Sequence, residues 1–392
     1  MEQSARILGL TGGGDDGWGV FYRAREMAAS GQDVTELTIG EHDIRTHPTI
    51  LAAMHQSATA GHTGYASVPG TPALRDAVAK RIATRTGVPT TRDNITITPG
   101  GQSALYAAHT ATLNPGDTGL ICDPYYATYP GTVRGTGAKL GVVPCHPEHN
   151  FEPSFADLDA AARGATTLLV NSPNNPTGVV YSRKTLEMIA KVALAHDLWV
   201  ISDEVYDTQI WDGSHVSLRS LPGMQDRTLV VGSMSKSHAM TGSRIGWICG
   251  QADVVSNLIN LSTHTTYGVP GYIQDAAHFA LGQGQSLEDE VGAPFERRRK
   301  IALAALSDQN LVKAVPPQGA MYLMLDIRAT GLTGIDFANN LLDQHKIAVM
   351  PGESFGNAAA GHVRVAMTVD DAAFQTALNT LIRFAQAQTG TK

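Results

Sequence analysis

Short apolar runs alternate with longer amphipathic stretches from about Asn94 onward. The chain carries the runs NITIT, TGLIC, TTLLV, LWVI, TLVVG and RIGWIC, separated by segments with helical spacing such as RKTLEMIAKVALAHD. Continuous apolar runs are typical of strands buried on both faces, and the helical segments between them are typical of βα units. The pattern predicts an α/β domain with a mostly parallel sheet that is covered by helices on both faces.

The pattern changes at about Glu288. From there the chain carries an Arg- and Lys-rich helix, APFERRRKIALAAL, then the strand-like segments AMYLMLDI, IAVMPG and HVRVAMT, and a closing helix, DAAFQTALNTLIRFAQ. This order predicts a smaller α+β domain over residues 288–392, beside a large domain over residues 46–287. We expect residues 1–45 to form an N-terminal arm and to supply part of the small domain.

The composition narrows the possible classes of protein. Of the 392 residues, 43% are hydrophobic and 17% are charged, as in an ordinary globular protein. The formal net charge of −7 and the lack of a basic block argue against nucleic acid or an anionic membrane as the main partner. No apolar run has the length of a membrane span, and the N-terminus lacks the features of a signal peptide. We therefore expect a cytoplasmic protein.

The cysteines and histidines show no metal site. Cys122, Cys145 and Cys249 lie far apart in or beside strand-like segments, which favours buried thiols in a reducing compartment. The 14 histidines form no H-E-x-x-H pattern. We expect neither a disulfide nor a bound metal ion.

Polar residues gather where the predicted strands end. These clusters are Gly100–Ser103, Asn171–Asn175, Asp203–Tyr206 and Ser233–Lys236. Because ligands of open α/β sheets bind beyond the carboxyl ends of the strands, we expect the four clusters to meet in one crevice.

Each cluster also has a plainer interpretation. The Gly100–Gly101 doublet before a helix can bind phosphate through free amides, but alone it is more often a turn. The loop NSPNNPTG is compatible with ordinary Asx-turn chemistry. Asp203 could keep a pyridine nitrogen protonated, and it could equally cap a helix. The early Gly12–Gly14 run predicts only a flexible turn.

Lys236 and its neighbours suggest one chemical role for the four clusters. A partly desolvated lysine amine can form a Schiff base with an aldehyde, whereas a surface lysine is normally just solvated. Ser233, Ser235 and Arg244 suit phosphate oxygens, the arginine through its planar fork. Their convergence on one crevice favours a covalently held, phosphate-bearing cofactor.

Four motifs together resemble one family. SMSKSHAMTGSRIGW, NSPNNPTG, SDEVY and TPGGQSAL match, in order and spacing, the class I/II aminotransferases, which are aspartate aminotransferase-like enzymes of fold type I. The resemblance extends from about Leu37 to Arg364. It implies pyridoxal 5′-phosphate as cofactor. It also implies a seven-stranded, mostly parallel sheet in the large domain and a small α+β domain.

The resemblance also implies roles for individual residues. Lys236, Asp203 and Tyr206 correspond to the catalytic set, with Lys236 as the Schiff-base lysine and Asp203 as the partner of the pyridinium nitrogen. Tyr206 and Asn175 correspond to the groups that bind the 3′-oxygen of the ring, and Tyr126 takes the place of the aromatic residue that stacks on it. The expected phosphate contacts are Gly101 and Gln102 through backbone amides, and Ser233, Ser235 and Arg244 through side chains.

Three further positions concern the substrate and a second subunit. Arg364 corresponds to the arginine that binds the substrate α-carboxylate, helped by Asn175, and Gly40 lies in the loop near that carboxylate. Tyr65 corresponds to the tyrosine that reaches the cofactor phosphate of the neighbouring subunit, so the resemblance implies a homodimer. Beside Tyr65, Thr71 is expected to cap the helix that begins at Pro72.

The chain departs from the family pattern at the mouth of the expected site. GEHDI replaces the usual GEPDF, Ser243 replaces a bulky residue before the phosphate arginine, and Tyr126 stands where several members have tryptophan. The amino donor therefore stays open, and no residue is assigned to a second carboxylate.

The expected function is ping-pong transfer of an amino group from an L-amino acid to a 2-oxo acid such as 2-oxoglutarate. The nearest alternative is a cysteine-conjugate β-lyase, because the same cofactor supports both outcomes. A non-catalytic effector-sensing module and a dehydrogenase fit less well. The chain shows no DNA-binding segment and no strand followed by G-x-G-x-x-G with a later acidic residue.

Overall fold

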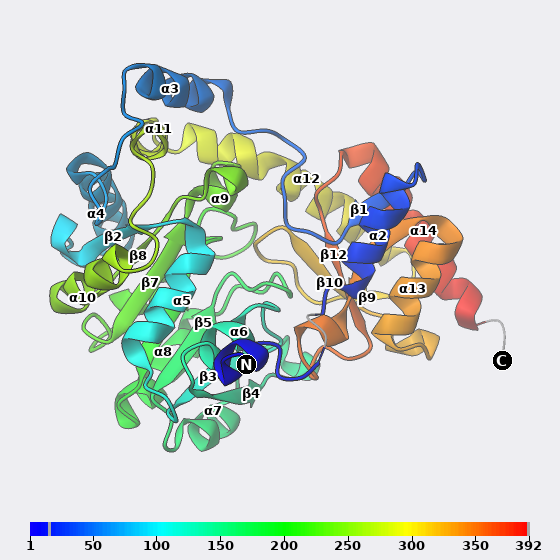
Figure 1. Ribbon diagram of the computed structural model, residues 1–392. Coiled ribbons are helices and arrows are strands. Elements are labelled where there is room, and N and C mark those ends of the chain that lie inside the picture. Colours follow the sequence, from blue (N-terminus) through cyan, green and yellow to red (C-terminus); the bar gives the residue numbers. More distant parts are fainter. Residues whose placement is uncertain (15–16, 390–392) are drawn as a thin grey trace.

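Two β-sheets, each with its own helices, lie side by side in the molecule (Figure 1). The computed structural model describes residues 1–14 and 17–389. In this part of the chain no helix is long and apolar enough to cross a membrane. All three cysteines are buried and free.

The larger sheet has seven strands in the order β2-β8-β7-β6-β5-β3-β4. They are β2 (Ile95–Thr98), β8 (Gly246–Cys249), β7 (Thr228–Ser233), β6 (Trp199–Asp203), β5 (Thr167–Asn171), β3 (Thr118–Asp123) and β4 (Lys139–Pro144). Strand β8 is antiparallel to both of its neighbours, and every other pair is parallel. The predicted seven-stranded, mostly parallel sheet is therefore confirmed.

Helices cover both faces of this sheet, as the apolar runs predict. One face carries α5 (Gly100–Thr112), α6 (Tyr129–Arg134) and α10 (Ala252–Thr263). The other carries α4 (Pro72–Thr86), α7 (Phe155–Ala162), α8 (Arg183–Ala195) and α11 (Gly271–Gly282), and α3 (Pro48–Thr59) packs on α11. Strand residues alternate between the faces: Leu229 and Val231 of β7 join the first core, whereas Val230 joins the second.

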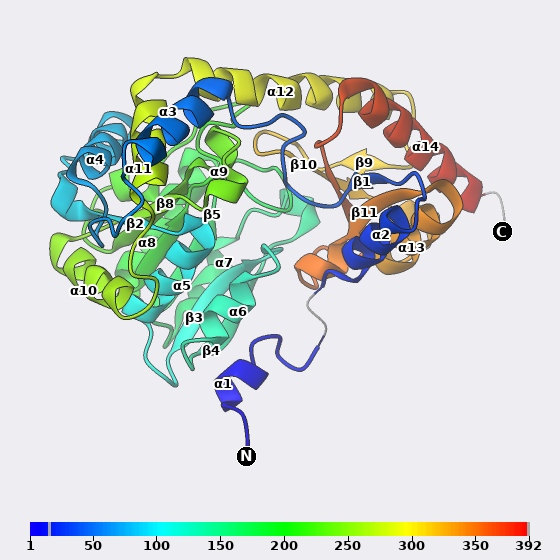
Figure 2. The same ribbon diagram turned by 45° about the horizontal axis from the view of Figure 1, so that its top comes forward.

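The smaller sheet has five strands in the order β1-β11-β12-β10-β9. They are β1 (Thr35–Leu37), β11 (Ile347–Pro351), β12 (His362–Ala366), β10 (Tyr322–Asp326) and β9 (Lys313–Ala314). Its helices are α2 (Gly19–Ala29), α13 (Gly334–His345), α14 (Asp371–Thr389) and part of α12 (Ser286–Ser307), which runs from the larger sheet to the smaller one in both views (Figure 2).

The N-terminal segment divides between the two sheets. Strand β1 pairs with β11 of the smaller sheet, and α2 packs against β11. The short α1 (Ala5–Leu8) lies instead near α6 of the larger sheet (Figure 2), where Arg134 contacts the Leu10 carbonyl. The division at 45/46 and 287/288 stays a prediction, and its second boundary falls within α12.

Two local predictions can be checked directly. Thr71 caps α4, because its hydroxyl accepts a hydrogen bond from the Leu74 amide at 3.4 Å. Gly12 and Gly13 lie in a turn with φ of 69° and 83°.

Candidate active site

A cavity of about 370 Å³ lies where the carboxyl ends of the central strands face the smaller sheet. All four polar clusters contribute to its wall, as expected. Of the predicted site residues it brings together Gly40, Gly101, Gln102, Tyr126, Asn175, Asp203, Tyr206, Ser233, Ser235, Lys236, Arg244 and Arg364. Segments that are far apart in the chain therefore form one site.

Lys236 lies in the one-turn helix α9 (Met234–Ser237), which follows β7 directly. Its Nζ contacts the Gly40 carbonyl. Burial lowers the pKa of this amine to about 8; Glu41 opposes the shift, and the charges of Arg364 and Arg244 add to it. Since a pKa of about 8 leaves about a tenth of the amine unprotonated at pH 7, Lys236 is far more nucleophilic than a solvated lysine.

Asp203 ends β6 deep in the same cavity. The Tyr129 hydroxyl donates to its Oδ2 at 2.7 Å, and the Val205 amide donates to Oδ1 at 3.3 Å. Burial raises the pKa of Asp203 to about 6, although both hydrogen bonds oppose that shift. The residues after Glu204 form turns, so the helix-cap alternative is wrong. A buried carboxylate with spare acceptor capacity suits a protonated ring nitrogen.

Arg364 reaches the cavity from β12 of the smaller sheet and is 1% exposed. It donates to Asn175 Oδ1 at 2.8 Å and to the Thr38 carbonyl. The rings of Tyr322 and Phe355 flank its guanidinium, each with a centroid 4.4 Å away. Its Nε is buried without a partner among the described residues. The guanidinium is thus held rigidly and keeps donor capacity for a carboxylate.

Tyr206 and Gly40 are fixed by the same tyrosine, Tyr322. The hydroxyls of Tyr206 and Tyr322 are 2.9 Å apart. A Cβ atom on Gly40 would lie 1.8 Å from the Tyr322 hydroxyl oxygen, so only glycine fits at position 40. Tyr322 therefore sets the shape of the cavity wall without having been predicted as a site residue.

The opposite end of the cavity gathers anion-binding groups. The Ser233 hydroxyl accepts from the Ser235 amide at 3.1 Å, and the two hydroxyls are 3.0 Å apart. Gly100, at the start of α5, has φ of 79°, and a Cβ there would lie 2.4 Å from the Arg244 guanidinium. Hydroxyls, a guanidinium and free amides at the start of a 13-residue helix fit a phosphate group. The donor set therefore fits pyridoxal 5′-phosphate.

Tyr126 and Tyr129 come from the same short segment, DPYYATYP, but point to different tasks. Tyr126 lines the cavity, and the centroid of its ring lies 5.7 Å from that of Tyr129 and 6.5 Å from that of Trp18. The sequence predicts only Tyr126 of this segment at the site, whereas Tyr129 begins α6 and its hydroxyl donates to Asp203. Sequence reasoning thus missed Tyr129, Tyr322 and Trp18 as lining residues.

Tyr65 is the one predicted site residue outside the cavity. Its side chain is 93% exposed, and its ring lies 5.2 Å from that of Tyr267. It makes no contact with the cofactor cavity of its own chain.

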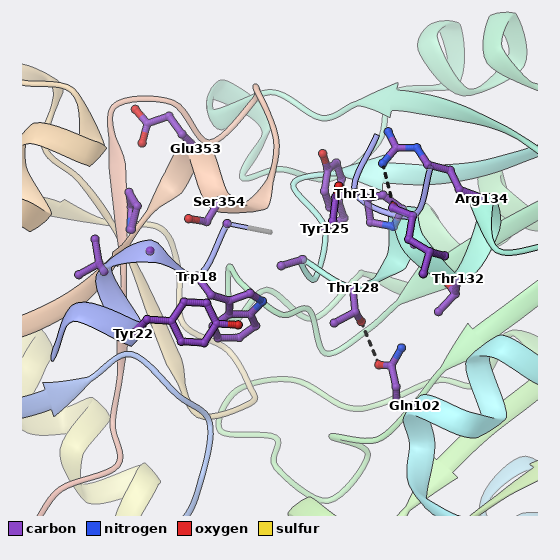
Figure 3. Close-up of a pocket in the computed structure, with 18 of the residues that line it drawn as sticks. Thr11, Trp18, Tyr22, Gln102, Tyr125, Thr128, Thr132, Arg134, Glu353 and Ser354 are labelled. Atoms are coloured by element: carbon purple, nitrogen blue, oxygen red, sulfur yellow. Dashed lines mark hydrogen bonds between the residues drawn. The ribbon is translucent and has the colours of Figure 1, made fainter. Parts of the chain in front are cut away.

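A wider cavity of about 780 Å³ adjoins the first one and shares Trp18 and Gln102 with it (Figure 3). The Thr128 hydroxyl donates to Gln102 Oε1 at 2.9 Å and so fixes the shared wall. The other walls come from the N-terminal segment, α6 and the loop around Ser354. Tyrosine rings, threonine hydroxyls and the Arg134 guanidinium line this cavity, which gives it a mixed polar and aromatic character.

Comparisons with known proteins show which family the chain resembles over nearly its whole length. Residues 32–381 match the family "Aminotransferase class I and II". The chain is 40% identical to the arginine–pyruvate transaminase AruH of Pseudomonas aeruginosa over 94% of both chains. It is 34% identical to the aspartate/prephenate aminotransferase of Thermus thermophilus over 93% of this chain and 94% of the relative. The solved aspartate aminotransferase of Thermus thermophilus with maleate superimposes with a TM-score of 0.91 at 32% identity, covering 98% of this chain and all of the other.

The raised pKa of Asp203 predicts that Asp203→Asn stabilises the cofactor-free protein at neutral pH. The carboxyl titrates near 3.8 when unfolded and near 6 in the fold, so stability falls as pH rises through this window. Removing the charge should add about 3 kcal/mol at pH 8 and under about 1 kcal/mol at pH 4. Denaturant unfolding at both pH values measures the difference. Identical gains at the two pH values would contradict the assignment.

Proposed function

The chain belongs to the class I and II aminotransferases, and we propose that the residues around Lys236 perform the reaction in the roles given below. It is a pyridoxal 5′-phosphate-dependent aminotransferase of fold type I that moves an amino group from an L-amino acid to a 2-oxo acid. Its relatives are named as transaminases, and nothing favours the β-lyase alternative. The observation that supports the site assignment is the convergence of Lys236, Asp203 and Arg364 on one cavity.

Pyridoxal phosphate would be held by residues of this cavity. Lys236 would be its attachment point, Asp203 would be the partner of the ring nitrogen, and Tyr126 would cover the ring. Tyr206 and Asn175 would bind the 3′-oxygen, and the phosphate contacts would be Gly101, Gln102, Ser233, Ser235 and Arg244. When bound, the cofactor supplies a protonated ring that accepts the electron pair left when the Cα–H bond breaks.

Lys236 carries the proton. Its Nζ accepts the proton from Cα of the amino donor and, in the second half-reaction, returns a proton to Cα of the acceptor. The lowered pKa matters here, because a base with a pKa near the working pH is unprotonated often enough to accept and basic enough to hold the proton. The contact between Nζ and Gly40 places the amine at the side of the cavity where the substrate carboxylate would bind.

Asp203 and Tyr129 act as a unit on the ring nitrogen. A cation next to Asp203 favours its charged form, and the Tyr129 hydroxyl already stabilises that form. The carboxylate in turn stabilises the protonated nitrogen, which is the form that accepts electrons.

Arg364 orients the substrate. Its planar guanidinium can hold an α-carboxylate through two parallel hydrogen bonds, which fixes the direction of the Cα–H bond. Asn175, which accepts one guanidinium hydrogen bond, sets the plane of that fork.

The wider cavity supports a donor with a long side chain. The two cavities meet at Trp18 and Gln102, so a side chain that extends from Cα past Trp18 enters a space of about 780 Å³. The relatives act by name on arginine, aspartate and prephenate. We propose that a long donor is preferred over aspartate. Among the described residues of this wall, Arg134 is the one cation that could meet a distal carboxylate, and the other charged side chain, Glu353, accepts from two backbone amides.

The exposed position of Tyr65 supports a homodimer. An aromatic side chain that is 93% exposed, with its ring against the exposed Tyr267, is typical of a surface that another subunit covers. In such a dimer each Tyr65 reaches the phosphate in the other subunit's cavity. The three free, buried cysteines are compatible with a cytoplasmic location.

A panel of amino acids should identify the donor. We expect the purified holoenzyme to convert to its amino form and release an oxo acid with long-chain donors such as arginine or phenylalanine, and more slowly with aspartate. The visible absorbance of the bound cofactor and an oxo-acid assay measure both steps.

Lys236→Ala should show neither the wild-type absorbance nor turnover. Turnover by that variant would remove Lys236 from its role, and release of pyruvate and ammonia from a cysteine conjugate would favour the lyase.

Arg364→Leu should weaken binding of every carboxylate substrate. Losing a charge-assisted fork of two hydrogen bonds corresponds to about 3 kcal/mol, or a rise in KM of about 100-fold. The rise should appear for donor and acceptor alike. The matched control is Arg328→Leu, because Arg328 is half exposed and pairs with Asp326 away from the cavity. Steady-state kinetics decide the point, and unchanged KM values would mean that another group binds the carboxylate.

Hybrid dimers should test the role of Tyr65. Lys236→Ala and Tyr65→Ala subunits are each expected to be impaired, but a mixed dimer contains one site with an intact lysine and an intact partner tyrosine. Co-expression with two affinity tags yields the hybrid, and its activity should exceed that of either parent. A hybrid no more active than its parents, or a fully active monomer in sedimentation, would contradict the shared site.

A further inference from the structure

The main-chain carbonyl of Lys236 is bound by two side chains from distant segments. Helix α9 spans only Met234–Ser237, and a helix leaves its last carbonyls without intrahelical partners. The Lys236 carbonyl accepts from His42 Nε2 at 3.0 Å and from Gln209 Nε2 at 3.1 Å. The backbone of the reactive lysine is therefore fixed by an imidazole and an amide rather than by its own helix.

His42 is held in a single protonation state. It is 6% exposed, and its ring lies edge-on to Phe295 with centroids 5.3 Å apart. Because a carbonyl only accepts, Nε2 carries the proton, and Nδ1 is buried with no partner among the described residues. Burial lowers the pKa of His42 to about 3; the charges of Lys236 and Arg298 act in the same direction, and Asp43 opposes them. The ring is neutral and donates at any working pH.

The residues on either side of His42 are anchored as well. Two positions earlier, the Gly40 carbonyl contacts Lys236 Nζ, so residues 40–42 touch both ends of the lysine. One position later, Asp43 accepts two hydrogen bonds from Arg298, at 2.9 and 2.6 Å. Arg298 is 3% exposed and also donates to the Met367 carbonyl and to Asp371, so this anchor belongs to the smaller sheet and its helices.

We propose that His42 is a positioning residue for Lys236, whose Nε2–H fixes the lysine backbone and hence the arc through which Nζ carries the proton. This inference rests on the proposed role of Lys236. A lysine has a flexible four-carbon side chain, so Nζ is placed only as well as its Cα is placed, and a displacement of about 1 Å can cost up to about 100-fold in rate. We call the hydrogen bond from His42 Nε2 to the Lys236 carbonyl the clamp. Proline, which is usual at this position of the motif that the sequence resembles, has no side-chain donor, so the clamp is a property of this chain.

Isosteric variants of the holoenzyme test the clamp. Glutamine at position 42 carries an amide nitrogen at the reach of Nε2, whereas leucine keeps much of the volume and has no donor. We expect His42→Leu to lower kcat by about five- to tenfold while the donor KM changes by less than about twofold, because substrate binding does not involve the clamp. The pH midpoint of the bound cofactor's visible absorbance should shift in His42→Leu. In His42→Gln, kcat and the pH midpoint should both return most of the way to their wild-type values.

Two further variants separate positioning from loss of stability. His109→Leu is the matched control, since His109 is also a fully buried histidine with one ring nitrogen on a backbone carbonyl, here Leu105 of its own helix. It should lower the melting temperature and leave the absorbance midpoint unchanged. Combining His42→Leu with Gln209→Leu should lower kcat by more than the product of the single effects, because the second loss leaves the carbonyl without a partner.

The outcomes are distinct. Wild-type kcat and absorbance midpoint in His42→Leu, or a His42→Gln variant no better than His42→Leu, would overturn the clamp. Borohydride reduction and mass spectrometry of the wild type locate the attached cofactor independently. Attachment to a residue other than Lys236 would overturn the proposed function, whatever the histidine variants show.

Discussion

The structure depends on a guanidinium that is buried where the two sheets meet. Arg364 belongs to the smaller sheet, yet one of its hydrogen-bond partners, Asn175, belongs to the larger one. An ionised group that is 1% exposed needs polar partners, because its desolvation is costly. Because Arg364 needs Asn175 as a partner, β12 is held against the loop that follows β5. The substrate site therefore exists only when both sheets are in place.

The same junction explains why the other charged groups are chemically active. Lys236 and Asp203 are both buried, and desolvation disfavours their charged forms, so the pKa of the amine falls and that of the carboxyl rises. In a solvated loop both would titrate at ordinary values and be of little use in proton transfer at neutral pH. The fold tolerates this destabilisation because apolar side chains form a large core on each face of the large sheet.

Apolar runs and strand-end motifs predicted the mostly parallel sheet and the four polar clusters of the cavity, because these features are local in sequence and their positions follow from the parallel topology. Gly40, Tyr126 and Arg364 were expected only from the resemblance to the family. Tyr129, Tyr322 and His42 could not be found this way. Each acts through one hydrogen bond to a residue more than 70 positions away, and its direction depends on where a helix begins or how two sheets pack. In the sequence, a tyrosine in a strand or a histidine in a loop does not show which distant residue its side chain will bind. Tyr65 is the opposite case, since its expected partner lies outside a single chain.

The charges around Lys236 also make its basicity respond to the substrate. Arg364 and Arg244 both lower the pKa of the amine through their positive charge. A carboxylate on Arg364 and a phosphate on Arg244 neutralise those charges at short range, so each ligand removes part of the unfavourable interaction with the protonated amine. Once a substrate has displaced Lys236 from the cofactor, these neutralised charges favour the protonated amine and so strengthen it as a base. This effect needs no movement of the backbone that His42 and Gln209 hold.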